Sequence, residues 1–186
     1  MKRGGFGRLF RCLLCLSFIS LILSVNGCSS NTISHYSDNL PKLDIKKFFE
    51  GKLIAKGIVK NFNGKVIRYF NADLDANWQG DTGILREVFY FNDGEVEYRN
   101  WTLRLKDMGH FIGTAEDVIG EASGDQKGNA IFMNYVLAIP YSDTTIEVSV
   151  DDKMYLVTPD TLINESYLYK YGIKVGEVVL TIQKKH

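Results

Sequence analysis

The chain has few of the residues on which most metal and redox sites depend: three cysteines, three histidines and three prolines among 186 residues. Cys12 and Cys15 lie in an N-terminal apolar segment that we expect to be removed, which leaves Cys28 alone. A single thiol forms neither an internal disulfide nor a thiolate metal site. The three histidines are expected in the tether (His35), at a strand start (His110) and at the terminus (His186), so we expect no histidine pair for metal binding or proton relay. We therefore expect no metal and no other cofactor.

Motifs for catalysis are also lacking. The stretch GDQKGNA at residues 124–130 lacks the lysine–serine ending and the following helix of a phosphate-binding loop. Asp151 and Asp152 resemble an acid pair for hydrolysis, but adjacent strand residues point to opposite faces, and a turn is the commoner position for paired aspartates. We expect that the protein is not an enzyme. The weaker alternative is a hydrolase or isomerase that uses Glu87 or Asp117.

Charge excludes another class of function. The sequence has 22 basic and 22 acidic residues, and four of the basic residues precede the N-terminal apolar run. Removal of residues 1–27 lowers the 22 basic residues by four to 18 and leaves all 22 acids, so the remaining chain is mildly acidic. It has no basic stripe that would suit phosphates. Nucleic acid is therefore not an expected partner.

The first 27 residues have the order of a secretory signal, with a basic start followed by an apolar core. That core, Leu13–Val25, has thirteen residues, whereas a membrane-crossing helix needs about 20. The residues VNGC that end at Cys28 resemble the lipobox of bacterial lipoproteins. The resemblance implies cleavage before Cys28, lipidation of its sulfur, and anchoring in the membrane by several acyl chains, which one chain would not achieve. Ser29 after the cysteine implies transfer to the outer membrane, facing the periplasm. The alternative is an ordinary signal peptide in which Cys28 is incidental.

The sequence after the signal divides into a tether and one domain. Residues 28–41 are polar and rich in turn formers, which indicates a flexible tether. Residues 42–186 have the length of a single domain. Asp44 can cap a short helical turn that points Phe48 and Phe49 into the body, and Gly51 can end it.

From Lys52 onward the apolar residues follow a period of two, with glycine, asparagine and aspartate at short intervals. This pattern predicts about ten strands, at residues 52–62, 65–78, 84–91, 95–105, 110–122, 129–140, 144–150, 153–158, 165–175 and 177–185, with a helical turn at 159–162. Tight hairpins leave a barrel or a sandwich. Few prolines and consecutive hairpins favour an all-β, up-and-down antiparallel barrel of about 8–10 strands, which has no exposed edge strands.

The hairpin around Asn92-Asp93-Gly94 is the most informative local pattern. A two-residue turn would place Glu87 and Arg99 on opposite faces. A three-residue loop with Gly94 in the left-handed conformation sets Glu87 directly opposite Arg99, among large apolar side chains. We predict this second register, in which the two charges pair because isolated buried ions are costly. The pair is either purely structural or holds a ligand's head group.

Two functions fit such a barrel. In the first, the lumen binds a lipid or another hydrophobic small molecule, with Asp117 on a neighbouring strand joining Glu87 and Arg99. In the second, the barrel is filled by its own side chains and the protein is a non-enzymatic accessory lipoprotein that contacts another envelope protein. The lumen in the first case is expected to be lined by Phe89, Trp101, Phe111 and Tyr135.

Five stretches of the sequence, taken in order, carry a family resemblance: FFEGKLIAKG, VFYFNDGEVEYRNW, GTAEDVIGEASGDQKGNA, SVDDKMYLV and KYGIKVGEV. They resemble the bacterial family called domain of unknown function 3833, over about residues 41–184, and the lipoprotein signal fits it. The family commonly has tryptophan after the paired aspartates, where this chain has Lys153. The order of elements is similar to that of the calycins, which include the lipocalins, although GKL at residues 51–53 lacks the lipocalin Gly-x-Trp signature. The resemblance implies a lipocalin-like fold and no particular ligand or activity.

Overall fold

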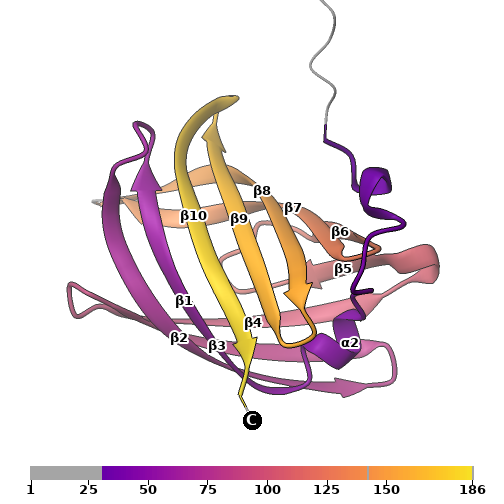
Figure 1. Ribbon diagram of the computed structural model, residues 1–186. Coiled ribbons are helices and arrows are strands. Elements are labelled where there is room, and N and C mark those ends of the chain that lie inside the picture. The colour runs from indigo at the N-terminus through magenta and orange to yellow at the C-terminus, as the bar shows by residue number, and fades with distance from the viewer. Residues whose placement is uncertain (1–30, 142, 186) are drawn as a thin grey trace, which may run out of the picture. The chain divides into compact units, whose positions relative to one another are not determined.

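The computed structural model describes residues 31–141 and 143–185. Within them, ten strands run antiparallel, each beside its neighbour in the sequence, and the last pairs with the first (Figure 1). The strands are β1 (Gly51–Asn61), β2 (Val66–Gln79), β3 (Thr82–Phe91), β4 (Val96–Leu105), β5 (His110–Thr114), β6 (Ala122–Lys127), β7 (Ala130–Tyr141), β8 (Thr144–Thr158), β9 (Thr161–Lys170) and β10 (Ile173–Lys184). The predicted up-and-down barrel is therefore confirmed.

The period of two in the sequence becomes an inside and an outside of the barrel, because successive strand residues point to opposite faces. In β2 the buried residues are Phe70, Ala72, Leu74 and Ala76. The residues between them are exposed and polar, as in the NADLDAN segment at 71–77. Each strand thus contributes one apolar row to a common interior.

A short helix, α2 (Ile45–Phe48), lies at one end of the barrel (Figure 1). The Asp44 carboxylate accepts a hydrogen bond from the backbone N–H of Lys47 at 3.1 Å, which satisfies a donor of the first turn as predicted. Phe48 and Phe49 are buried, and the Phe49 carbonyl accepts a hydrogen bond from the Trp78 indole N–H at 2.8 Å. These contacts fix α2 as a plug at this end.

The segment before α2 also packs on the barrel. It forms the 3₁₀ helix η1 (Ile33–Tyr36), whose Tyr36 ring lies 5.5 Å from the Phe132 ring. A Cβ atom at Gly128 would lie 1.7 Å from the Tyr36 carbonyl oxygen, so only glycine allows this approach. The compact unit that contains the barrel begins at Ile33.

That unit contains all ten strands and the plug, so we expect it to fold on its own. Cys28 and the signal segment lie outside the described residues. The division into signal, tether and barrel, with boundaries at 27 and 41, stays a prediction. No helix in the described part of the chain is long and apolar enough to cross a membrane.

Several predicted strand boundaries were wrong. The single strand expected at 110–122 is β5, a loop and then β6, and GDQKG is mostly strand rather than loop. Asp151 and Asp152 do not form a turn but lie in the middle of the continuous strand β8. Residues 159–162 hold a tight turn rather than a helical one. The last hairpin turns at Tyr171-Gly172, where both residues have positive φ, rather than near residue 176.

Candidate functional site

The barrel encloses a cavity of about 650 Å³. Its lining runs from Ile45 and Phe49 beside the plug to Glu95 and Tyr98 next to the β3–β4 turn. Tyr98 is largely exposed to solvent, so the cavity opens at this second end. We call this opening the mouth. A cavity of this size falls in the range of small-molecule sites, about 300–1,000 Å³.

Most of the lining is aromatic or aliphatic. The Phe70 and Phe89 rings meet edge to face with centroids 5.5 Å apart, and the Trp101 and Tyr135 rings do so at 5.4 Å. All four, and Phe111, line the cavity. The structure therefore brings together Phe89, Trp101, Phe111 and Tyr135, the predicted apolar lining, although their part in binding a ligand stays a prediction.

The β3–β4 hairpin has the predicted register. Glu87 lies directly opposite Arg99. The Phe91 N–H donates to the Glu95 carbonyl at 3.0 Å, and Gly94 has a φ of +90°. The left-handed glycine and the three-residue loop thus set both charged side chains on the inner face of the barrel, as the sequence indicated.

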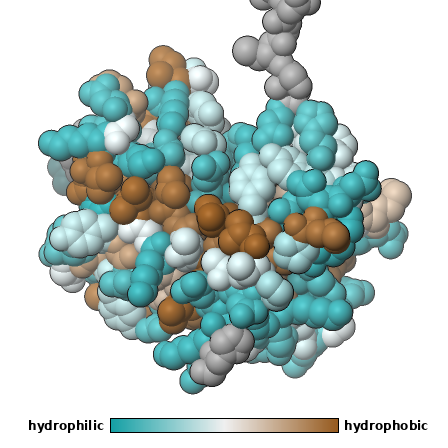
Figure 2. All heavy atoms as spheres, viewed as in Figure 1, coloured by the Kyte–Doolittle hydropathy of each residue, from teal (hydrophilic) through white to brown (hydrophobic). Residues whose placement is uncertain are grey.

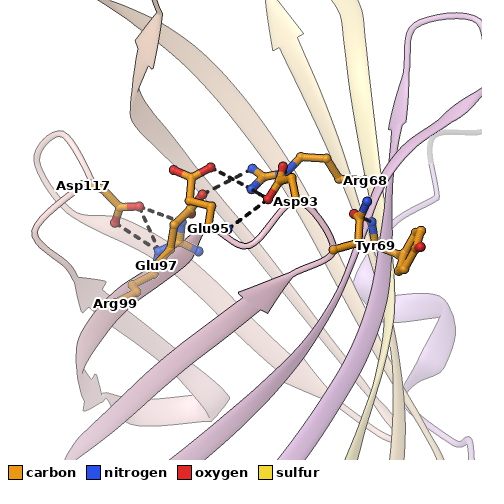
Figure 3. A network of polar contacts seen from close by, with 8 residues as sticks. Arg68, Tyr69, Asp93, Glu95, Glu97, Arg99 and Asp117 are labelled. Atoms are coloured by element: carbon orange, nitrogen blue, oxygen red, sulfur yellow. Dashed lines mark hydrogen bonds and ion pairs between the residues drawn. The ribbon is translucent and has the colours of Figure 1, made fainter.

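Within the described residues Glu87 and Arg99 form no ion pair, contrary to the prediction, whereas Asp117 joins Arg99 as expected. Arg99 Nη2 instead donates to Asp117 Oδ2 at 2.6 Å, and Arg99 Nε donates to the same oxygen at 2.9 Å (Figure 3). Asp117 lies in the β5–β6 loop rather than on a strand. The Ala138 N–H donates to the Asp117 carbonyl at 2.9 Å and fastens this loop to β7. A contact between distant segments therefore decided the partner of Arg99.

Glu87 is left as a buried carboxyl inside an apolar wall. Its Oε2 atom has no hydrogen-bond partner among the described residues. The pKa of Glu87 is raised to about 7. Burial is the main cause, the nearby Asp152 and Asp117 add to the rise, and Arg99 and a hydrogen bond from Trp101 oppose it. Near neutral pH this carboxyl can either donate or accept a proton in the cavity.

Arg99 remains charged despite its burial. Burial alone would lower the pKa of its guanidinium, but the Glu87 carboxylate and the hydrogen bond to Asp117 outweigh that effect and raise the pKa above its ordinary value. Arg99 is therefore a permanent cation, and two of its three nitrogen atoms donate to Asp117.

A second buried carboxyl, Asp152 on β8, was missed from the sequence. Its side chain accepts hydrogen bonds from Asn164 Nδ2 and from Ser166 Oγ, the latter at 2.9 Å, and Tyr135 Oη lies 3.4 Å away. Burial raises the pKa of Asp152 to about 6, although the hydrogen bonds from Asn164 and Ser166 oppose the rise. The signal was present, because Val148, Val150 and Asp152 share the period-two face of one strand.

At the mouth, Arg68 forms a second polar cluster (Figure 3). Its Nη2 atom donates to Glu95 at 2.7 Å and to Asp93 at 3.0 Å, and its guanidinium carbon lies 3.6 Å from the centre of the Phe91 ring. These contacts tie β2 to the β3–β4 turn and hold one side of the mouth in place. Among residues 31–141 and 143–185, no group of three or more potential ligands could hold a metal.

Comparison with known proteins places the chain in a family. The family model described as "Protein of unknown function (DUF3833)" matches residues 22–184. The chain belongs to this family. A sequence comparison with curated proteins finds no match. The DUF3833 resemblance expected from the five sequence stretches is therefore confirmed, over a slightly longer range.

A solved structure with the same fold is the S-type phycobiliprotein lyase CPES from Guillardia theta. It is 10% identical, with a TM-score of 0.58, and the match covers 84% of this chain and 98% of that chain. At this identity the likeness shows a shared lipocalin-like fold. It also overturns the expectation that the DUF3833 chain is not an enzyme, because a barrel of this fold serves as a lyase. Missing histidine pairs and phosphate loops gave no valid ground for that expectation.

Proposed function

We propose that the barrel binds a hydrophobic small molecule or lipid that carries an uncharged or cationic polar group. One observation carries the proposal: the cavity of about 650 Å³ is mainly apolar and contains the buried Glu87 carboxyl, with one oxygen unpartnered among the described residues. Transfer of the apolar part of a ligand from water into the cavity lowers the free energy, and a few convergent polar groups fix the orientation of the ligand. The cavity argues against the alternative of a barrel filled by its own side chains.

The charges in the wall favour this kind of polar group over an anion. Glu87, Asp117 and Asp152 all line the cavity. The nearby cation, Arg99, is already bonded to Asp117 through two nitrogen atoms. An anionic head group would therefore meet more like charge than opposite charge. A hydroxyl or carbonyl can accept from protonated Glu87, and an amine can pair with it when it is ionised.

A matched series of ligands tests the proposal. Residues 31–186 are titrated with hexadecanol, hexadecylamine and hexadecanoate against a fluorescent apolar probe held in the cavity. We expect the alcohol and the amine to displace the probe at concentrations about tenfold or more below the acid, which corresponds to about 1.4 kcal/mol. Failure of all three to displace the probe would contradict binding, and a preference for hexadecanoate would contradict the stated polarity.

A matched pair of variants tests whether Glu87 causes the preference for the alcohol over the acid. Glu87→Gln keeps the size of the side chain and removes its charge, so we expect the gap between hexadecanoate and hexadecanol to narrow. Glu121→Gln removes an exposed carboxylate outside the cavity lining and serves as the control. Equal effects of both substitutions would mean that the discrimination does not arise at Glu87.

We further propose that the protein is a lipoprotein of the bacterial outer membrane that faces the periplasm. The support is the VNGC sequence at the end of the apolar segment and the position of Cys28 as the sole cysteine of the processed chain. Cys28→Ser should yield an unprocessed or soluble periplasmic protein in cell fractionation. A variant that is cleaved and still partitions with membranes would exclude Cys28 as the anchor.

A further inference from the structure

Two neighbouring hairpins at the mouth end carry exposed apolar side chains. The β1–β2 and β9–β10 hairpins lie side by side, because Asn61 pairs with Gly176 where the two hairpins approach their turns (Figure 1). Tyr171 is 91% exposed, Ile173 69% and Phe62 67%. We define the tip patch by its exposed members, Phe62, Val66, Ile67, Tyr171, Ile173 and Val175. Figure 2 shows brown, hydrophobic spheres at this end of the barrel.

The tip patch is not explained by the fold. Side chains on the strands pack inward or alternate with polar residues, whereas Phe62 and Tyr171 lie in turns, where polar residues are usual. Large apolar side chains gathered at one exposed end mark a surface that contacts something other than water.

Two lysines beside the tip patch, Lys65 and Lys170, add positive charge to it. Residues 60–72 and 166–176 contain lysines and one arginine but no aspartate or glutamate. Within the described residues no salt bridge involves Lys65 or Lys170, and Lys170 Nζ lies 4.8 Å from the centre of the Tyr171 ring. The other cations of these segments are neutralised: Lys60 and Lys174 pair with Glu177, and Arg68 pairs with Asp93, Glu95 and Glu97. The tips therefore present apolar and aromatic groups together with uncompensated positive charge.

We propose that the tip patch docks on an anionic lipid bilayer. Aromatic side chains favour the level of the lipid head groups, aliphatic side chains enter below it, and lysines beside them attract anionic lipid. The contact would turn the mouth of the cavity toward the membrane. This inference rests on the exposed hairpin tips and is independent of the identity of any ligand in the cavity.

The barrel offers a matched control at its other end. Met108 is 89% exposed, and it and Tyr171 are the non-glycine residues of positive φ in the described chain, at +59° and +51°. Met108 lies in η2 (Asp107–Gly109), which joins β4 to β5 at the plug end. Asparagine tolerates this backbone conformation. Tyr171→Asn and Met108→Asn therefore remove one exposed apolar side chain each, at opposite ends, without new backbone strain.

Vesicle sedimentation tests the proposal with residues 31–186, which lack Cys28. We expect binding to phosphatidylglycerol–phosphatidylcholine vesicles and weaker binding to phosphatidylcholine alone. Phe62→Ser with Tyr171→Asn should abolish binding, whereas Met108→Asn should leave it unchanged. Lys65→Gln with Lys170→Gln should weaken binding to the anionic vesicles by roughly 30-fold. Circular dichroism confirms that each variant is folded.

A direct readout complements sedimentation. Tyr171→Trp places an indole at the tip, and its emission should shift to the blue when anionic vesicles are added, while Met108→Trp should show no shift. The proposal is overturned if the unaltered barrel binds neither kind of vesicle, if both kinds bind equally, or if the Met108 variants behave like the Tyr171 variants. A dimer formed through the tips in the absence of lipid would also overturn it.

Discussion

Glu87→Gln should stabilise the protein, and the gain should grow with pH. The pKa of Glu87 is raised by burial from 4.5 to about 7 in the folded state. Between pH 4.5 and pH 7 the folded protein therefore binds more protons at this site than the unfolded chain does. The contribution of Glu87 to the free energy of unfolding is full below pH 4.5 and is lost as pH rises through about 7. A difference of about 2.5 pKa units corresponds to about 3 kcal/mol at high pH, and about 2 to 3 kcal/mol of it appears between pH 5 and pH 8.

Urea unfolding measures this effect directly. Free energies of unfolding of the wild type and of Glu87→Gln are compared at pH 5 and pH 8, and the difference between the two proteins should widen by about 2 to 3 kcal/mol in favour of the variant. Asp152 is present in both proteins, so its own loss of stability with rising pH largely cancels. Asp73→Asn, which removes an exposed carboxylate on the outer face of β2, supplies the baseline. A gap that stays constant with pH would refute the reasoning that Glu87 is ionised at a cost inside the cavity.

Three further predictions follow from single contacts. Arg99→Met should cost about 2 to 4 kcal/mol in urea unfolding, because it removes the partner of Asp117 and the cation whose charge acts on Glu87; an unchanged midpoint would mean that the Arg99–Asp117 contact adds nothing. Gly124→Ala should cost about 1 to 3 kcal/mol, because its Cβ would lie 2.2 Å from the Phe111 ring, and Ser123→Ala, at a neighbouring exposed position, should be nearly neutral in the same thermal melt. Asp152→Leu should leave Asn164 and Ser166 without their acceptor and lower the melting temperature, and a stable, well-folded variant would contradict that role.

Local chemistry made part of this structure predictable. Asp44 defined the short helix because a side-chain cap acts within one turn, and Gly94 fixed the β3–β4 register because the turn type sets the pairing of the strands. The period of two then placed Trp101 and Phe89 inside the barrel without any knowledge of the strands beside them.

The parts that failed depend on contacts between distant segments. Asp152 was assigned to a turn because paired aspartates favour turns, but burial between β7 and β9 and hydrogen bonds from Asn164 and Ser166 keep β8 continuous. The sequence placed Asp117 near Arg99, but it did not show that Asp117 rather than Glu87 bonds Arg99, because Asp117 reaches it only after the β5–β6 loop folds against β7. No local pattern in the sequence encodes that approach.

The plug formed by α2 gives the cavity a blind end. Ile45 and Phe49 line this closed end, so a ligand of the proposed kind would enter and leave through the mouth, with its inner end against Phe49. The depth of the cavity would therefore limit the length of ligand that the proposed site can enclose. An alkyl chain shorter than the cavity would be fully enclosed. Each further carbon would remain outside the mouth, where it would add little to the binding affinity.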